Sequence, residues 1–396
     1  MTKIMNDVYI ITGTRTPIGS FSGSLKDLSA PELGSIAIRS AVQKAGIEPS
    51  DIDETLMGCV LTGGLGQAPA RQAAIKAGIP TQVPATTINK VCGSGMKTVM
   101  LGAQAIKLGD NEIVLAGGME SMTNAPYILE KARQGYRMGN GKLIDSMIQD
   151  GLWDPYKNVH MGTCGDATAK EYNITREEMD EFSAESYCRA QSAQNEGILA
   201  EEITSVKVPQ RKGDPLVISE DEEPKRGKID KLPSLRPAFD KEGLVTAGNA
   251  STINDGAAAL ILASDQACET QGLKPLGKIV AYSSHAQEPE WFTTAPATAI
   301  QKLLDKCNLT VNDIDLFEIN EAFALVAMYA ARELNIPSEK MNVNGGAVSL
   351  GHPIGMTGTR LILTALYELR RRKAKYAIAS PCIGGGEATA ILIEAF

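Results

Sequence analysis

The sequence contains few aromatic residues, few histidines and no excess of positive charge. Of its 396 residues 5% are aromatic, with 2 Trp, and only 3 are His. Lys and Arg number 39 against 47 Asp and Glu, which gives a net charge of −8. Proteins that bind nucleic acid or an anionic membrane surface rely on a basic field. We therefore expect neither partner, and an anionic ligand must be met by a local cluster of cations.

Several common motifs are also absent. The seven cysteines are scattered and contain no Cys-x-x-Cys pair, which excludes a zinc ribbon and a thioredoxin motif. Phosphate-loop and dinucleotide-binding glycine patterns are missing, and no apolar run approaches the roughly 18 residues of a membrane span. Met1 to Asp7 lead directly into the strand-like run Val8–Ile11, so we expect no transit peptide and a cytoplasmic protein with reduced thiols.

The composition that remains is that of a globular α/β protein. Hydrophobic residues make up 43% of the chain, which is long enough for more than one core. Strand-like runs alternate with helical stretches: Val8–Ile11 precedes Leu33–Ala45, and Leu316–Ile319 follows Ala299–Cys307. This alternation predicts an α/β fold with short, largely parallel, buried strands.

The two ends of the chain resemble each other. Ala37-Ile38 returns as Ala299-Ile300, and Asp51-Ile52-Asp53 returns as Asp313-Ile314-Asp315, each 262 positions later. Such ordered matches indicate two duplicated α/β halves. The segment from about 120 to 250 is charged and contains prolines, which is typical of a loop-rich insertion on the surface.

The most informative segment surrounds Cys92, in Val91-Cys92-Gly93-Ser94-Gly95. An apolar run ends at Val91 and a helix is predicted from about Ser94, which places Cys92 at the positive end of a helix dipole. Free N–H groups and the dipole are expected to lower the pKa of the thiol, as a nucleophile requires. The alternative is a small buried residue beside glycines needed for close packing.

Three other polar residues precede predicted helices or glycine-rich turns. By the repeat register, His352 occupies the place in the second half that Cys92 occupies in the first, so the two are expected to meet. Cys382 precedes Gly384-Gly385-Gly386, whose N–H groups could form an oxyanion site or only a tight turn. Asn320 is a predicted helix N-cap or an amide that orients a water.

Together these motifs resemble the thiolase family over essentially the whole chain. The matching segments, in order, are Val91–Gly95, Gly248–Ala257, Asn320–Phe323, Gly351–Gly355 and Cys382–Gly386. The acetyl-CoA C-acetyltransferase branch is the most similar, because His160-Met161-Gly162 is a mark of that branch. The implied reaction is the reversible, ping-pong Claisen condensation of two acetyl-CoA to acetoacetyl-CoA and CoA.

The resemblance also implies a fold and its divisions. The thiolase fold joins two duplicated βαβαβαββ halves into a five-layer α-β-α-β-α core with an inserted loop domain. The expected divisions are 1–120 plus 251–275 for the N-terminal half, 121–250 for the insertion that binds CoA, and 276–396 for the C-terminal half. Like other thiolases, the protein is expected to form a homotetramer, a dimer of dimers, with contacts from Asn124–Leu143.

The resemblance assigns roles to five residues. Cys92 is the implied acylated nucleophile and His352 the group that activates it. Cys382 is expected to move the proton at the α-carbon of the second acetyl-CoA. Asn320, through a water, and His352 would form one oxyanion hole, and the N–H groups of Cys92 and Gly384 the other.

Coenzyme A is expected as substrate and product, with no permanently bound cofactor and no metal. The implied CoA contacts are His160, Met161, Arg226 and Ser251. The insertion carries a basic cluster that we expect to be mostly a solvated loop: Lys207, Arg211, Lys212, Lys225, Arg226, Lys228 and Lys231.

Three positions depart from the family pattern. Pro224 replaces the tyrosine that helps hold a monovalent cation in mitochondrial acetoacetyl-CoA thiolases, so potassium activation is not carried over. Trp291 stands where many bacterial enzymes have a small residue, which leaves the acyl chain-length range and 2-methyl-branched substrates open. Glu387 after the glycines is also atypical.

Two other functions remain as alternatives. A β-ketoacyl synthase or hydroxymethylglutaryl-CoA synthase shares the fold, but lacks the second cysteine or carries a histidine motif in place of Asn320–Phe323. A non-catalytic acyl-CoA-binding or lipid-binding relative would have lost the reactive residues. Cys382 and Asn320 argue against the first, and the complete set of reactive positions argues against the second.

Overall fold

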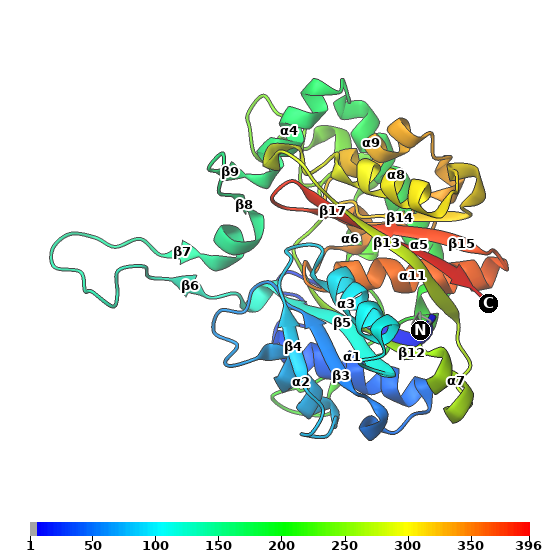
Figure 1. Cartoon of the computed structure of the whole chain (residues 1–396). Helices are drawn as coiled ribbons and strands as arrows, with labels where there is room; N and C mark the ends of the chain where they lie inside the picture. The colour runs from blue at the N-terminus through cyan, green and yellow to red at the C-terminus, as the bar shows by residue number, and fades with distance from the viewer. Residues whose placement is uncertain (1–5) are drawn as a thin grey trace.

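The computed structural model describes residues 6–396, and within them a similar succession of strands and helices occurs twice (Figure 1). The expectation about the start of the chain falls partly on residues 1–5, which lie outside the described residues. The first half contains β1 (Val8–Arg15), α1 (Ala30–Ala45), β3 (Glu54–Gly58), α2 (Pro69–Ala77), β4 (Ala85–Ile88), α3 (Ser94–Leu108), β5 (Ile113–Ser121), β12 (Asn254–Ser264) and α7 (Asp265–Gln271). The second contains β13 (Gly277–Ala286), α8 (Ala295–Cys307), β14 (Leu316–Ile319), α9 (Ala324–Leu334), α10 (Ala347–Leu350), α11 (Thr357–Arg372), β15 (Tyr376–Ser380), β16 (Cys382–Ile383) and β17 (Glu387–Ala395). The duplication predicted from the sequence is therefore confirmed.

The strands follow the order β14-β15-β17-β13-β1-β12-β5-β3-β4, so β13 and β1 join the two halves at the centre. Only β3–β4, β3–β5 and β14–β15 are parallel, and the remaining pairs on this path are antiparallel. The expectation of largely parallel strands is wrong for a physical reason. β12 enters after a long insertion and β17 follows β15 through a tight turn, so neither is reached by the crossover helix that a parallel pair needs.

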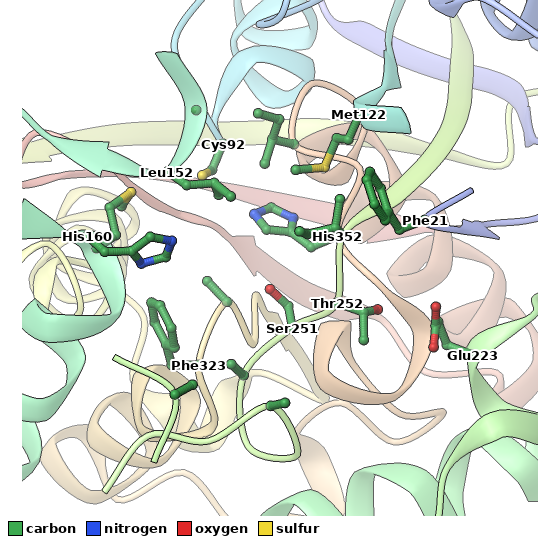
Figure 2. A pocket seen from close by; sticks show the side chains of 18 of the residues that line it. Phe21, Cys92, Met122, Leu152, His160, Glu223, Ser251, Thr252, Phe323 and His352 are labelled. Carbon is green, nitrogen blue, oxygen red and sulfur yellow. The ribbon is translucent and has the colours of Figure 1, made fainter. Parts of the chain in front are cut away.

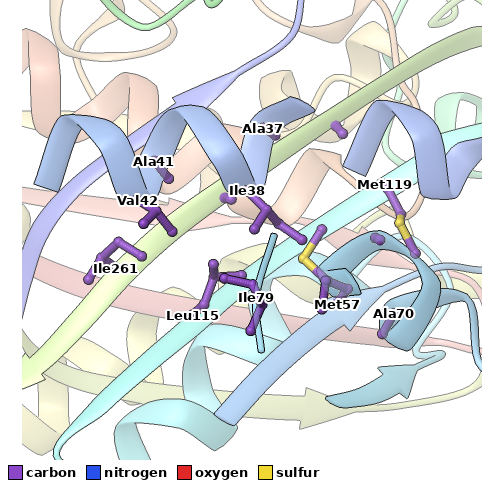
Figure 3. Packing of buried hydrophobic residues seen from close by; sticks show 14 of the residues in the cluster. Ala37, Ile38, Ala41, Val42, Met57, Ala70, Ile79, Leu115, Met119 and Ile261 are labelled. Atoms are coloured by element: carbon purple, nitrogen blue, oxygen red, sulfur yellow. The ribbon is translucent and has the colours of Figure 1, made fainter. Parts of the chain in front are cut away.

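Three sets of helices cover the two halves of the sheet and give the five-layer order α-β-α-β-α. Helices α1 and α2 pack on the outer face of the first half, where Ile38 and Val42 of α1 share a buried cluster with Leu115 of β5 and Ile261 of β12 (Figure 3). Helices α8 and α9 cover the outer face of the second half. Helices α3 and α11 lie between the halves, in a core that includes strand residues from both. The five-layer fold is therefore confirmed.

The central helices approach each other closely at their N-terminal ends. A Cβ atom on Gly95 would lie 2.6 Å from Thr359 Oγ1, and one on Gly358 would lie 2.4 Å from the backbone nitrogen of Met96. Any larger residue at either glycine would push the helices apart. This contact brings together the two turns that precede α3 and α11, which carry Cys92 and His352.

The segment between β5 and β12 lies outside the layered core. It contains the short strands β6 (Tyr127–Ile128), β7 (Ile144–Asp145), β8 (Trp153–Asp154), β9 (Val159–His160), β10 (Val206–Val208) and β11 (Leu216–Ile218), with helices α4 (Met161–Glu171), α5 (Arg176–Asn195) and α6 (Glu223–Arg226). The stretch between β6 and β7 extends far from the body of the molecule (Figure 1). No helix in the described part of the chain combines the length and hydropathy needed to cross a lipid bilayer.

A buried ion cluster attaches this segment to the first half. Arg15 at the end of β1 donates from Nε to Glu202 Oε1 at 2.6 Å. Its Nη1 and Nη2 donate to the two carboxylate oxygens of Asp221 at 2.7 and 2.8 Å. The Arg15 side chain is fully buried, and the two carboxylates supply the charge compensation that a buried guanidinium requires.

Candidate active site

Cys92 lies in a turn between β4 and α3. The Ser94 hydroxyl donates to the Val91 carbonyl at 2.6 Å and accepts from the Lys90 N–H at 2.8 Å, which closes the turn. Val91 has φ +45°, a left-handed conformation that is costly for a β-branched residue. The neighbouring elements hold this residue in place, so that the next side chain, Cys92, reaches a cavity from the end of α3.

The expected low pKa of Cys92 is wrong. Burial raises the pKa of this thiol to about 11, and the N–H groups of Gly384 and of Cys92 itself oppose the rise only in part. The sequence correctly places N–H donors beside the sulfur, but their effect is smaller than the cost of a charge that is shielded from water. The resting side chain is thus a neutral thiol at pH 7.

His352 lies in the turn before α11 and is 4% exposed. The Thr357 hydroxyl donates to the Pro353 carbonyl at 3.0 Å, so it accepts from His352 Nδ1, 2.6 Å away. The hydrogen on Nδ1 leaves Nε2 as a proton acceptor. Burial lowers the pKa of His352 to about 3, so the imidazole is neutral and available as a base.

Asn320 and Cys382 are fully buried beside these two residues. Asn320 Nδ2 lies 3.4 Å from His352 Nε2 and also hydrogen-bonds the Cys382 thiol. Burial and the neighbouring Cys92 sulfur raise the pKa of Cys382 well above its ordinary value. Asn320 is not the helix N-cap proposed as one alternative, because α9 begins only at Ala324.

A cavity of about 520 Å³ opens in front of Cys92 and His352 (Figure 2). Four more residues predicted from the sequence line it, namely His160, Met161, Arg226 and Ser251. Among the predicted site residues, Asn320, Cys382 and Gly384 do not line it. They adjoin it through Cys92 and His352, and Gly384 lines a smaller neighbouring recess of about 190 Å³. The geometry therefore brings all nine predicted site residues to one place.

His160 presents one ring nitrogen to this cavity. It caps α4, with Nδ1 accepting from the Gly162 N–H at 3.1 Å, so Nε2 carries the hydrogen of the neutral ring. The ring stacks on Phe239 at 4.3 Å, and burial lowers its pKa. His160 is thus a fixed, neutral hydrogen-bond donor.

A second recess of about 570 Å³ shares Arg226 and Ala247 with the main cavity. Its cationic residues are Lys225, Arg226, Lys228 and Lys231. The other members of the predicted basic cluster, Lys207, Arg211 and Lys212, line neither space. The cations that adjoin the cavity are therefore the four that follow Pro224.

Residues 8–266 match the family described as "Thiolase, N-terminal domain", and residues 273–395 match "Thiolase, C-terminal domain". The chain belongs to the thiolase family. It is 50% identical to an acetyl-CoA acetyltransferase of Cupriavidus necator over 391 residues, which cover 98% of this chain and 100% of the relative. Another acetyl-CoA acetyltransferase, from Pseudomonas aeruginosa, is 49% identical over 98% of this chain and 99% of its own.

Solved thiolase structures agree with this one along the chain. The Bacillus anthracis acetyl-CoA acetyltransferase matches with a TM-score of 0.97 and 40% identity, covering 100% of both chains. The Acat5 thiolase of Ascaris suum, solved in complex with coenzyme A, matches with a TM-score of 0.94 and 43% identity, covering 98% of this chain and 100% of that one.

Sequence reasoning missed several groups around this thiolase site. Glu120 is fully buried at the end of β5 and accepts hydrogen bonds from three backbone N–H groups, one of them that of Gly355 in the His352 turn. Its position at a strand end after two glycines was the available signal. Phe21, in a loop, and Glu223, at the start of α6, also line the cavity, but they are remote in sequence and carried no signal.

The described residues around this site do not form a set of metal ligands. Among residues 6–396, no group of three or more His, Cys, Asp or Glu side chains is placed to hold a metal ion.

Proposed function

We propose that this thiolase is an acetyl-CoA C-acetyltransferase that condenses two acetyl-CoA to acetoacetyl-CoA and CoA, and catalyses the reverse thiolysis. The observation that carries the proposal is the grouping of two thiols, a neutral imidazole and an amide beside one cavity, which Cys92 and His352 line directly. A single nucleophile would suffice for acyl transfer. A second thiol beside it suits the proton abstraction that carbon–carbon bond formation adds.

In the first half-reaction, Cys92 attacks the thioester carbonyl of acetyl-CoA while His352 Nε2 accepts the thiol proton. The negative charge on the carbonyl oxygen is stabilised by the N–H groups of Cys92 and Gly384. When the tetrahedral intermediate collapses, the C–S bond to CoA breaks and the CoA sulfur takes the proton of the Cys382 thiol, which leaves Cys382 as thiolate and His352 protonated. The products are acetyl-Cys92 and CoA.

In the second half-reaction, Cys382 as thiolate removes a proton from the methyl group of a second acetyl-CoA. The resulting enolate, whose oxygen is stabilised by Asn320 through a water and by His352, attacks the acetyl group on Cys92, and the N–H groups of Cys92 and Gly384 again stabilise the oxyanion. Cleavage of the C–S bond to Cys92 releases acetoacetyl-CoA. The Cys92 sulfur leaves as thiolate and takes the proton held by His352, while Cys382 keeps the proton from the methyl group, which restores the starting state.

The residues expected to hold coenzyme A are His160, Met161, Arg226 and Ser251. A donor at His160 Nε2 suits a pantetheine carbonyl, and the cations around Arg226 suit the phosphates. In this assignment residues 121–250 form the CoA-binding insertion, between an N-terminal half of 1–120 plus 251–275 and a C-terminal half of 276–396. Coenzyme A serves as substrate and product, and no cofactor is permanently bound.

The proposed assembly is a homotetramer, a dimer of dimers. Strand β6 and the extended stretch that follows it expose large apolar side chains: Tyr127, Ile128, Leu129, Tyr136, Met138 and Leu143. Exposed apolar groups on an extended loop suit contact with another subunit. Sedimentation equilibrium of the wild type and of Leu143→Glu tests this, because a variant that stays tetrameric would place the contact elsewhere.

The proposed location is the cytoplasm, with no nucleic-acid or membrane partner. All seven cysteines are free, which suits a reducing compartment. The net charge of −8 leaves no basic field for nucleic acid.

The test of function is thiolysis of acetoacetyl-CoA, followed by loss of its enolate absorbance. Wild type and Cys188→Ser, which changes an exposed cysteine of α5, should turn over equally. Cys92→Ala should be inactive. Cys382→Ser should still acquire one acetyl group at Cys92 by mass spectrometry but condense slowly. An inactive wild type under reducing conditions would refute the activity, and rapid condensation by Cys382→Ser would refute the division of roles.

A further inference from the structure

A salt bridge links the turn that carries Cys92 to the turn that carries Gly384. Lys90 Nζ pairs with Glu387 Oε2, and the two side chains are 24% and 35% exposed. Lys90 and Glu387 are 297 positions apart and come from different halves of the fold. The proposed reaction assigns neither residue a role.

Both ends of the pair are directly coupled to the reacting groups. Lys90 lies two residues before Cys92, and its carbonyl accepts from the Gly93 N–H at 3.0 Å. Glu387 pairs with Ile383 at the base of the glycine turn. Gly384 is the next residue after Ile383, and its N–H hydrogen-bonds the Cys92 sulfur.

The two turns also touch at a second point. A Cβ atom on Gly93 would lie 2.3 Å from Ile383 Cδ1, so the backbone of the Cys92 turn rests against the Ile383 side chain. Packing can stop the turns from moving closer, but it does not prevent them from separating. The salt bridge opposes separation.

The glycine turn has the backbone freedom to move. Gly385 and Gly386 have φ +91° and +83°, in the left-handed region. Three consecutive glycines restrict their own backbone little, so contacts outside the turn must fix the direction of the Gly384 N–H. Glu387 supplies the charged contact at its C-terminal end.

We propose that the Lys90–Glu387 pair is a positioning device that holds the Gly384 N–H at the Cys92 sulfur and thereby sets the oxyanion geometry of the acetyl-enzyme. This inference rests on the proposed function and adds two positioning residues to it. Neither side chain lines the cavity, so both act through the backbone that they connect.

The first experiment measures acetylation of Cys92 by acetyl-CoA in Glu387→Gln, Lys90→Met and the reversed pair Lys90→Glu with Glu387→Lys. Each single variant should acetylate Cys92 more slowly, on the order of fivefold, because a partly exposed pair contributes modestly while a small displacement at a reacting centre costs rate. KM for acetyl-CoA should change by less than about twofold, since the CoA contacts are untouched. The reversed pair should recover most of the rate. Glu185→Gln, which breaks a surface pair on α5, is the matched control and should match wild type.

The second experiment follows alkylation of Cys92 by iodoacetamide as a function of pH, and it does not require turnover. Loss of the Gly384 N–H should raise the alkylation midpoint by about half a pH unit. Glu387→Gln separates this from a simple charge effect: removing a negative charge by itself would lower the midpoint. The other titratable groups around Cys92, namely His352, Cys382 and Glu120, are unchanged in every variant.

Four results would overturn the proposal. The first is that the single variants keep the acetylation rate and the alkylation midpoint of the wild type, and the second is a lower alkylation midpoint in Glu387→Gln. The third is a rise in KM that by itself accounts for the slower acetylation. The fourth is a reversed pair that acetylates Cys92 more slowly than either single variant. Thermal unfolding of each variant shows whether it is folded, and the reversed pair keeps the test valid if one single variant is not. If the wild type fails to react with acetyl-CoA, the proposed function fails, while the alkylation midpoints still decide whether the pair positions Gly384.

Discussion

Replacing Glu120 by glutamine tests how a buried carboxylate fastens two loops behind the active site. Glu120 Oε2 accepts from the N–H groups of Val60 at 3.0 Å and Gly355 at 2.9 Å, and Oε1 accepts from Leu61 at 3.1 Å. Cys59 Sγ lies 3.7 Å from Oε1. Glutamine keeps the size of the side chain but replaces one acceptor oxygen by a donor group, so one backbone N–H loses its partner.

The expected change in stability depends on pH, and its sign follows from burial. Burial raises the pKa of Glu120 from 4.5 to about 7, in spite of the N–H groups that favour the charged form. The contribution of this group to stability is therefore fully present below pH 4.5 and is lost as pH rises through 7. The difference between the two pKa values corresponds to about 3 kcal/mol of unfolding free energy. Glutamine does not titrate, so the variant does not lose stability in this way as pH rises. The backbone N–H group that loses its acceptor in the variant costs about 1–3 kcal/mol at every pH.

The assay is urea unfolding of wild type and Glu120→Gln at four pH values between 4.5 and 8. The variant should be less stable at pH 4.5, and the difference should close or reverse by pH 8. Glu185→Gln on the surface of α5 controls for general effects of removing a carboxylate. A wild-type-minus-variant difference that stays constant over this pH range would refute the raised pKa, and a variant more stable at pH 4.5 would refute the role of the three N–H contacts.

Three other substitutions test the framework of the site. Gly95→Ala, at the crossing of α3 and α11, should lower the unfolding free energy by about 2–3 kcal/mol. The control Gly46→Ala should lower it by about 1 kcal/mol, because a Cβ atom on Gly46 meets nothing within 4 Å. Equal losses for the two variants in urea unfolding would contradict the close crossing of the helices. Arg360 pairs with the buried Glu318 side chain at 2.9 Å, so Arg360→Met should lower the unfolding free energy by about 3–5 kcal/mol. Adding Glu318→Gln to this variant should restore part of that stability. If the losses of the two single variants simply add in the double variant, the two residues are not a coupled pair. Val91→Gly removes the backbone strain at the φ of +45° and should slow acetylation of Cys92 without lowering thermal stability. An unchanged acetylation rate would show that this strain does not contribute to catalysis.

The sequence predicted the positions in this fold that depend on local chemistry. The apolar face of α1 and the glycines around Cys92 encode a helix and a strand-to-helix turn, and α3 begins at Ser94, as predicted. The direction of β12 and β17 was not predictable in this way, because it depends on how the chain returns from a long insertion and from a tight turn. Local pattern carries no information about either return.

The residues of the site also differ in whether local sequence pattern predicts them. Cys92 and His352 stand beside glycines in two equivalent turns, and this motif alone indicates that they meet. Glu120 and Thr357 support those turns from neighbouring elements, and their roles appear only when β5 and α11 are placed in space. The protonation states also required the structure, because burial, which sets the pKa values of the thiol and the imidazole, is a property of the packed core.

Those protonation states constrain the chemistry of the first step. Burial puts the pKa of Cys92 at about 11 and that of His352 at about 3. Moving the proton from sulfur to imidazole in the resting site would therefore cost about 11 kcal/mol before the attraction between the two new charges is counted. Such a cost disfavours a preformed thiolate–imidazolium pair. The transfer becomes accessible when charge moves on to a carbonyl oxygen held by hydrogen-bond donors, so deprotonation of Cys92 belongs to the same step as its attack on the thioester.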